Sequence, residues 1–332
     1  MKRTFFAVMI LAAFLLASAG ILAAEAAEEY RIKLGQTVSE KDLNYQAVRD
    51  VFKTHVEEAS GGRVKVDLYP NNQLGGERQM IEGLTLGTIE MGVISPAIVA
   101  GFIPSWQVFD LPYLFKDRET AYRALDGGLG DRLKADSLKK GIRTFTFAEN
   151  GVRQVTNNRA PVNKPEDFAG MKIRVMENPV HMATFKAFGA NPTPISFGEL
   201  YTALHQKTVD GQDNPATVVY SSKFYEVQKY LSLTGHVYAP SSMLISEVYF
   251  KKLPAEIQQI LVDGAEKYRD YERKLCSDNE IILIEEMRKA GVEVNEVSPE
   301  NKQIFMERTK DIYDQFKDKI GADVIELARS FN

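Results

Sequence analysis

Cysteine and histidine are scarce in this chain, and the usual sequence patterns of metal and catalytic sites are missing. Cys276 is the only cysteine among 332 residues, so a disulfide within the chain is excluded. The four histidines, at positions 55, 181, 205 and 236, follow no zinc-ligand or metalloprotease spacing. The sequence also contains no Walker A motif, no G-x-S-x-G elbow and no Gly-x-Gly-x-x-Gly run. These absences weaken an enzymatic interpretation without excluding it, and we expect no metal, no cofactor, no catalytic residues and no enzymatic activity.

The start of the chain has the pattern of a secretory signal peptide. Two basic residues precede an apolar run over residues 5–16, and an A-x-A-like cleavage site ends at Ala26. The apolar run is too short for a membrane-spanning helix, which argues against the alternative of a retained membrane anchor. We expect residues 1–26 to be removed near Ala26 and the remaining chain to be exported.

The charge of the chain is mildly acidic, with a net charge of −4 at pH 7. Such a chain has no general attraction for nucleic acid or anionic lipid, so we expect no nucleic-acid partner. Any anionic ligand must be bound by cations gathered locally. The length is sufficient for two lobes with separate cores.

The spacing of apolar residues predicts an α/β fold. Strands are predicted at 31–34, 64–68 and 89–94, with helices at 43–58 and 77–86 between them. This β-α-β-α-β order favours a parallel sheet with helices on its faces. A similar order follows a predicted crossing at 149–151, with strands at 171–175, 193–195 and 209–212 and helices at 181–188 and 199–207.

The rest of the chain is predicted to return to the first lobe and then to brace both lobes. Residues 237–250 are strand-like but interrupted by Pro240. A helical pattern over residues 254–290 would be ~54 Å long, more than the width of one lobe. We therefore expect lobe I over residues 27–150 plus about 239–278, and lobe II over residues 151–238 plus about 279–332.

Arg174 is the strongest candidate for a ligand-binding residue. It lies in a short alternating strand that Asn178-Pro179 brings to an end, because a residue before proline avoids helical backbone angles. Strand ends in open α/β sheets present side chains to ligands. The planar guanidinium fork of arginine fits a carboxylate bidentately, which lysine cannot copy. We predict that Arg174 binds the acid group of a small ligand in a cleft between two lobes.

Further candidates lie at the predicted crossing or in loops after strands. Arg153 follows the crossing, Asn214 ends a predicted strand, and Phe197 could stack on a flat ligand face. For either arginine the alternative is a solvated surface residue, and for Phe197 it is a core phenylalanine; composition alone excludes neither alternative. The remaining candidates occupy places suited to groups that recognise hydroxyls, and they are Gln36, Glu77, Asp213, His236 and Tyr238. Glu77 could instead serve only the dipole of the helix that it begins, and His236 and Tyr238 could simply end the returning strand.

Several separated motifs make this sequence resemble the DctP-type solute-binding proteins of tripartite ATP-independent periplasmic (TRAP) transporters. The matching segments are LGGER at 74–78, DLPYLF at 110–115, GVR at 151–153, EDFAGMKIRV at 166–175, GANP at 189–192 and VDGQDNP at 209–215. The resemblance extends over nearly all of the chain after the signal peptide.

The resemblance implies a two-lobed periplasmic binding protein, class II-like, with a hinged cleft and a long helix bracing both lobes. It implies that Arg174 makes the main salt bridge to a ligand carboxylate, with Arg153 and Asn214 assisting and Phe197 contacting the ligand. Gln36 and Glu77 match positions at which the family varies with its substrate. The implied partners are a small organic acid and the membrane permease subunits of a sodium-driven transporter, and we expect a monomer.

The ligand and two alternative functions stay open from the sequence. A C4-dicarboxylate needs a second cation, for which Arg153 could serve, whereas a sugar acid needs one cation and hydroxyl partners. We favour a sugar acid, because acidic groups near the cleft would repel a second carboxylate. The alternative functions are a binding protein of an ATP-driven importer or sensor and an exported enzyme acting on a carboxylated substrate.

Overall fold

The computed structural model describes residues 28–332, and within them nine strands form one mixed sheet. The predicted signal peptide lies outside the described residues. The strands are β1 (Tyr30–Gly35), β2 (Val64–Tyr69), β3 (Met91–Ile94), β4 (Ile142–Asn157), β5 (Lys172–Val175), β6 (Asn191–Pro194), β7 (Gly211–Pro215), β8 (Tyr230–Ser246) and β9 (Glu293–Glu296). Their order is β2-β1-β3-β8-β4-β7-β5-β6, with β9 beside β8.

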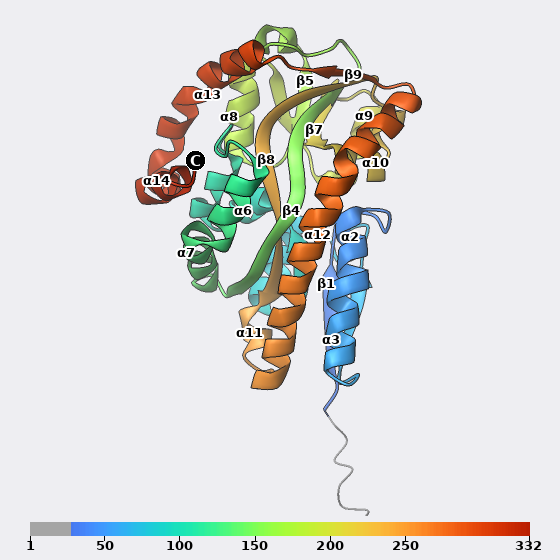
Figure 1. Cartoon of the computed structure of the whole chain (residues 1–332), viewed down its shortest axis with the longest axis vertical. Coiled ribbons are helices and arrows are strands. Elements are labelled where there is room, and N and C mark those ends of the chain that lie inside the picture. The colour runs from blue at the N-terminus through green and yellow to red at the C-terminus, as the bar shows by residue number, and fades with distance from the viewer. Residues whose placement is uncertain (1–27) are drawn as a thin grey trace, which may run out of the picture.

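The two predicted parallel units are present, but they are joined by antiparallel strands. β1 pairs in parallel with β2 and β3, and β5 pairs in parallel with β6 and β7. Between these units β8 and β4 run antiparallel to each other and to their outer neighbours β3 and β7. Figure 1 shows β4 and β8 running through the middle of the molecule from one lobe to the other. The predicted α/β fold class with two lobes is confirmed.

The predicted crossing at 149–151 lies inside one continuous strand, and the prediction that Pro240 interrupts the strand-like segment 237–250 is wrong. β4 and β8 continue through these positions, and the pairing shifts by one residue between Glu149 and Gly151. Such a bulge bends a strand without ending it, and it also tolerates a proline that has no amide proton to donate. Gly151 has a φ of +126°, and a Cβ atom there would lie 2.8 Å from Pro215 Cβ. The glycine is therefore required by both its backbone angle and the close neighbouring strand.

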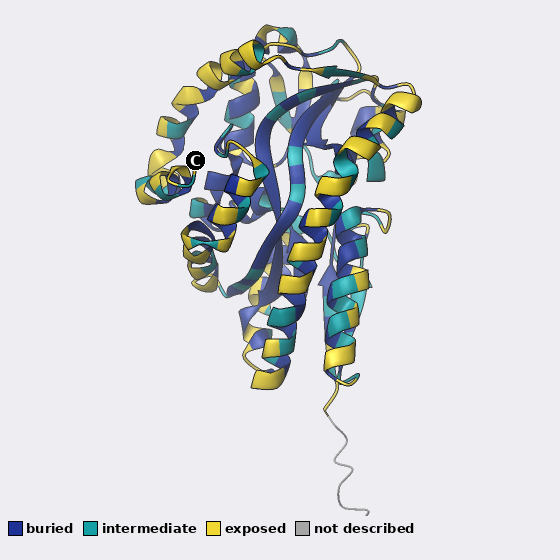
Figure 2. Ribbon diagram, viewed as in Figure 1, coloured by how far each residue is buried: buried dark blue, intermediate teal, exposed yellow. Residues whose placement is uncertain are grey.

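The helices cover both faces of the sheet, with their exposed faces outward (Figure 2). They are α2 (Leu43–Ala47), the π-helix η1 (Val48–Lys53), α3 (Thr54–Ala59), α4 (Glu77–Leu86), α5 (Pro96–Val99), the 3₁₀-helix η2 (Pro104–Asp110), α6 (Arg118–Asp126), α7 (Gly128–Leu138), the 3₁₀-helix η3 (Pro165–Phe168), α8 (Pro179–Phe188), α9 (Phe197–His205), α10 (Ala216–Ser221), the 3₁₀-helix η4 (Phe224–Glu226), α11 (Glu247–Phe250), α12 (Ala255–Lys289), α13 (Pro299–Ile320) and α14 (Ala322–Arg329).

Helix α12 spans both lobes, as the helical pattern predicts. It has 35 residues and is therefore about 52 Å long. It packs against α2, η1 and α3 near one end, against β4 in the middle, and against α10 and β9 near the other end (Figure 1). In the part of the chain that the structure describes, no helix has both the length and the apolar character that a membrane span needs.

Four clusters of buried apolar residues form the core. One contains Trp106 with residues of α6 and α7, and it also includes Ile312 and Phe316 of α13. A second lies between β1–β3 and the helices η1 and α12. The other two surround the sheet of the second lobe. The C-terminal helices therefore help to cover the Trp106 cluster. The exact lobe boundaries given above stay a prediction.

A buried carboxyl group joins α12 to β4 near the bulge. Glu272 is fully buried, and its oxygens accept hydrogen bonds from the Glu149 backbone N–H at 2.6 Å and from Cys276 Sγ at 2.9 Å. Burial raises the pKa of Glu272 to about 8, and the neighbouring carboxyl groups of Glu149 and Asp42 add to that rise. This carboxyl group is therefore mostly protonated in the folded protein at neutral pH.

Replacing Glu272 by glutamine should reduce the pH dependence of stability. The pKa of Glu272 is higher in the folded than in the unfolded chain, so the folded state holds the extra proton and the unfolding free energy falls as the pH rises towards about 8. Urea unfolding at about pH 5.5 and about pH 8.5 should show a smaller loss of stability in Glu272→Gln than in the wild type. Glu285→Gln, on the exposed side of α12, is the matched control. Equal losses in Glu272→Gln and the wild type would contradict this account.

Candidate functional site

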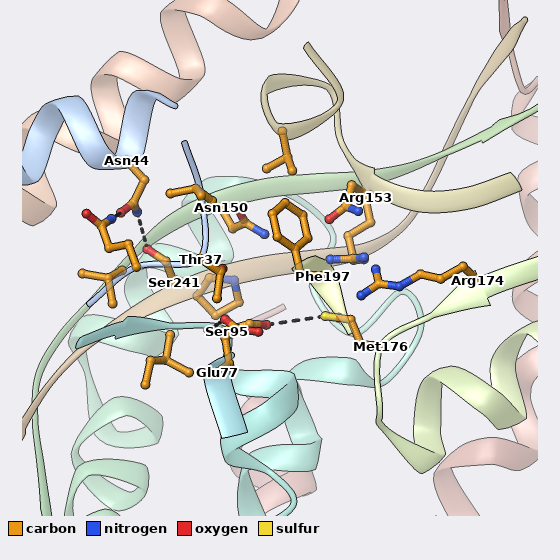
Figure 3. Close-up of a pocket in the computed structure, with 17 residues that line it drawn as sticks. Thr37, Asn44, Glu77, Ser95, Asn150, Arg153, Arg174, Met176, Phe197 and Ser241 are labelled. Atoms are coloured by element: carbon orange, nitrogen blue, oxygen red, sulfur yellow. Dashed lines mark hydrogen bonds between the residues drawn. The ribbon is translucent and has the colours of Figure 1, made fainter. Parts of the chain in front are cut away.

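A small cavity of about 60 Å³ lies between the two lobes, where the ends of several strands meet. Of the residues predicted from sequence, those that line the cavity are Gln36, Glu77, Arg153, Arg174, Phe197 and Asn214. They come from both lobes: Gln36 follows β1 and Glu77 begins α4, while the other four lie on β4, β5, α9 and β7. The fold therefore brings together residues that are far apart in the sequence (Figure 3).

Arg174 is a buried cation at this cavity. Arg174 is only 2% exposed. Its Nε donates a hydrogen bond to the Ile195 carbonyl oxygen at 2.8 Å. Within residues 28–332 its guanidinium forms no ion pair with a carboxylate. Burial lowers the pKa of Arg174 to about 10; the positive charge of Arg153 acts in the same direction, and the carboxylates of Asp213 and Glu77 oppose it. The group is still charged at neutral pH, so it offers a desolvated positive charge to an anion.

Arg153 is also buried at the cavity, but its charge is already compensated. Its Nε donates to Asp213 Oδ2 and its Nη2 donates to the Asp213 backbone oxygen. Arg153 and Asp213 are 1% and 0% exposed. Burial alone would raise the pKa of the Asp213 carboxyl, but the Arg153 charge and a hydrogen bond from His236 hold that pKa well below its usual range. The two arginines therefore differ: Arg153 is paired inside the protein and Arg174 is not.

The structure does not place Asp213, His236 and Tyr238 on the wall of the cavity, where direct ligand contact was predicted. Asp213 lies behind Arg153, and His236 Nε2 is 3.2 Å from its Oδ2. Tyr238 packs edge-on against Phe115 and Tyr122. Residues two apart on a strand point to the same side, and His236 and Tyr238 both pack edge-on against aromatic rings, His236 against Phe185 and Phe188. Asp213 and His236 therefore position Arg153, and Tyr238 belongs to the core.

Glu77 and Phe197 line the cavity together with the two arginines (Figure 3). Glu77 Oε1 accepts a hydrogen bond from the Ser95 backbone N–H at 2.7 Å. Burial raises the pKa of Glu77 to about 7, although Arg174 and Arg153 act in the opposite direction. Phe197 is the first residue of α9, and its ring lines the cavity (Figure 3). The ring packs edge-on against the ring of Phe224. An apolar face thus lies beside a cationic end and an acidic group.

Sequence reasoning missed a set of polar residues that also line the cavity, namely Thr37, Asn44, Ser95, Asn150 and Ser241. Asn44 Nδ2 donates to Ser241 Oγ at 3.0 Å and to Tyr268 OH at 2.7 Å, and its Oδ1 accepts from Gln36 Nε2 at 2.8 Å. Ser241 follows Pro240 within the long, buried β8. A polar residue such as Ser241 within a buried strand could have indicated a site residue. The predicted interruption of the strand at Pro240 prevented this interpretation.

The lobes touch each other around the cavity. Ser221 Oγ donates to Asp42 Oδ2 at 2.7 Å, and Asn178 Nδ2 donates to the Ala97 carbonyl oxygen at 2.9 Å. Ser95 Oγ lies 3.6 Å from Met176 Sδ (Figure 3). Opening of the lobes would have to break these contacts, and closure around a solute would form them. A cavity with a buried cation, enclosed between two lobes in this way, is the arrangement expected of a two-lobed solute-binding protein.

Comparison with known proteins identifies the family. Residues 34–319 match the model of DctP, the bacterial extracellular solute-binding protein family 7, and the chain belongs to this family of TRAP solute-binding proteins. The chain is 42% identical over 263 residues to the 2,3-diketo-L-gulonate-binding periplasmic protein YiaO of Escherichia coli K12. The aligned residues cover 79% of this chain and 80% of that protein.

Solved structures agree with this assignment. The sugar acid binding protein DctPAm of Advenella mimigardefordensis in complex with galactonate has a TM-score of 0.89 and 35% identity, covering 92% of this chain and 99% of that one. A TRAP periplasmic solute-binding protein of Sulfurospirillum deleyianum with bound succinate has a TM-score of 0.87 and 32% identity, covering 92% and 100%. The relatives named above are ligand-binding transport proteins of the periplasm.

Proposed function

We propose that this protein is the extracytoplasmic solute-binding subunit of a TRAP transporter and that it captures a small carboxylate-bearing solute. The observation that carries the proposal is the buried, charged Arg174, which has no carboxylate partner among the described residues and lies against the interlobe cavity. A ligand carboxylate would supply the missing negative charge and could accept two parallel hydrogen bonds from the guanidinium.

In this mechanism Arg174 makes the main ion pair, and Arg153 and Asn214 assist from the neighbouring strands. Asn214 Nδ2 donates to Gln212 Oε1 at 2.5 Å, which fixes its amide beside the arginines. Phe197 covers an apolar part of the solute, and Gln36 and Glu77 bind its polar groups. Hinge closure buries the ion pair, and the closed form docks on the membrane permease subunits.

The proposal has consequences for the location and state of the protein. Residues 1–26 act as a signal peptide cleaved near Ala26, so the protein works in the periplasm. It acts as a monomer without a cofactor and releases its solute chemically unchanged. A binding protein of an ATP-driven importer or a sensor would have a similar site, and the neighbouring genes distinguish these: two permease subunits of unequal size support the TRAP assignment, and an ATPase gene contradicts it.

A thermal-shift screen against organic acids should reveal the solute. A ligand at one hundred times its dissociation constant stabilises the folded state by about 2.7 kcal/mol, which corresponds to a rise in Tm of roughly 5–10 °C. We expect this for at least one sugar acid or dicarboxylate and not for the matching neutral polyol. Recovery of the acid unchanged after prolonged incubation would argue against an enzyme, and an absence of stabilisation by any acid would contradict the proposal.

A further inference from the structure

A turn of one lobe and the start of a helix of the other lobe meet at the outer rim of the cleft. Asn71 and Asn72 follow β2 in the first lobe, and Gly198 is the second residue of α9 in the second lobe. All three line the mouth of the cleft and also a separate groove beside it, and none of them lines the inner cavity. Their contact therefore lies outside the space that the solute occupies.

Gly198 allows the two lobes to approach each other closely at this rim. A Cβ atom at position 198 would lie 3.0 Å from Asn72 Nδ2 and 3.3 Å from Asn72 Cγ, which is closer than the ~3.5–4.0 Å at which carbon atoms pack best. A glycine in a helix is unfavourable, because it loses more conformational freedom on folding than other residues do. The close approach of Asn72 gives a physical reason for the glycine in the first turn of α9.

The turn is attached to one wall of the inner cavity. The Asn71 N–H donates to the Val38 carbonyl oxygen at 2.9 Å, and the Asn72 N–H donates to the Gln36 carbonyl oxygen at 3.3 Å. Gln36 and Val38 both line the cavity. Asn71 and Asn72 have left-handed backbone angles, with φ of 54° and 59°, which asparagine tolerates better than most residues. The turn therefore moves together with this wall.

Gly198 is attached to the opposite wall. The residue before it, Phe197, lines the inner cavity and begins the same helix. The contact between Asn72 and Gly198 thus depends on the distance between two walls with the solute between them. Separation of the lobes breaks this contact, and closure forms it.

We propose that the Asn71–Asn72 turn and Gly198 form a latch that closes the outer rim of the cleft and controls how long a bound solute is retained. This inference rests on the proposed function and adds the element that regulates release. The latch residues act on opening of the lobes and do not bind the solute. A change at the latch therefore alters the dissociation rate of the solute much more than its association rate.

The test joins the two sides of the latch by a disulfide in a variant with both Asn72→Cys and Gly198→Cys. Asn72 Cβ is one bond beyond the Cγ atom that lies 3.3 Å from a Cβ at position 198, so the two Cβ atoms come near the ~3.5–4.5 Å separation found in disulfides. The probes are D-galactonate, succinate and the tightest-binding acid of the thermal-shift screen. Each single variant is a control, because the remaining native cysteine, Cys276, is buried.

A probe that binds wild type should accelerate oxidation of the latch disulfide by diamide at least ~10-fold, because a closed form populated to ~10% or less becomes the major form with solute. The disulfide should also trap the bound probe until a reductant is added. Formation at the same rate with and without every probe that binds, or no formation at all, would overturn the latch while the solute-binding function stands. If wild type binds no probe, the proposed function itself fails.

Gly198→Val gives a second measurement that needs no cross-link. The added side chain should displace Asn72 and raise the dissociation rate of the probe at least ~10-fold, with little change in its association rate. Adding Asn72→Gly should restore slow release, because it makes room for that side chain and glycine suits the left-handed backbone at position 72. An unchanged dissociation rate in Gly198→Val would contradict the latch.

Discussion

Arg174→Ala should abolish measurable binding of the solute while the fold stays intact. Truncating one member of a desolvated, hydrogen-bonded ion pair costs ~2–5 kcal/mol, which corresponds to a loss of affinity from ~30-fold to a few thousand-fold. The ligand-free variant should be at least as stable as the wild type, because the substitution removes a buried charge that has no internal carboxylate partner among the described residues. Calorimetry measures the affinity, and urea unfolding measures the stability.

Two further variants make this prediction specific. Arg174→Lys should also bind poorly, because an ammonium group restores the charge but not the planar fork. Arg78→Ala is the control, since Arg78 is an exposed arginine at the mouth of the cleft, and a surface change of this kind usually alters free energies by less than ~0.5 kcal/mol. Near-normal affinity in Arg174→Ala would show that the ion pair with the ligand carboxylate does not form at this residue.

Asp213→Ala should have the largest effect on stability. It leaves the guanidinium of Arg153 buried without its carboxylate, and breaking a buried pair in this way costs ~3–5 kcal/mol. His236 also loses its hydrogen-bond partner. Because the pKa of Asp213 is lowered in the folded state, its contribution is complete above the unfolded pKa and is lost only as the pH falls through the folded value.

The control for Asp213 is an ion pair on the surface. Arg31 and Asp67 pair at 3.0 Å, with side chains that are 70% and 35% exposed. Asp67→Ala should therefore cost no more than ~1 kcal/mol. Urea unfolding at neutral pH compares the two variants directly. If Asp213→Ala were as stable as Asp67→Ala, Asp213 would not be needed to hold Arg153 in place.

Much of the site was predictable because local patterns place its residues at strand ends and helix starts. The alternation around Arg174 predicted β5, and the structure confirms that strand with a buried arginine in it. Glu77 begins α4 and Gln36 follows β1, as the periodicity indicated. Such features depend on neighbouring residues in the sequence, so the sequence contains them in readable form.

The pairing of Arg153 with Asp213 was not predictable, because it depends on the register between two strands. The two residues are 60 positions apart, and the antiparallel pairing of β4 with β7 brings them together. Asn44 of α2 and Ser241 of β8 come into contact across 197 positions, because α2 packs against the strand. The bulge in β4 and β8 explains why Pro240 did not end a strand. Each of these features is set by tertiary packing, which a local pattern does not specify.

The central claim is that the guanidinium of Arg174 and the carboxylate of the solute bind each other. The most direct test measures the affinity of wild type and Arg174→Ala for the tightest-binding acid of the screen and for its primary amide, which has nearly the same shape and no charge. The account predicts that wild type prefers the acid by at least ~30-fold and that Arg174→Ala has almost no preference. An unchanged preference for the acid in Arg174→Ala would contradict it.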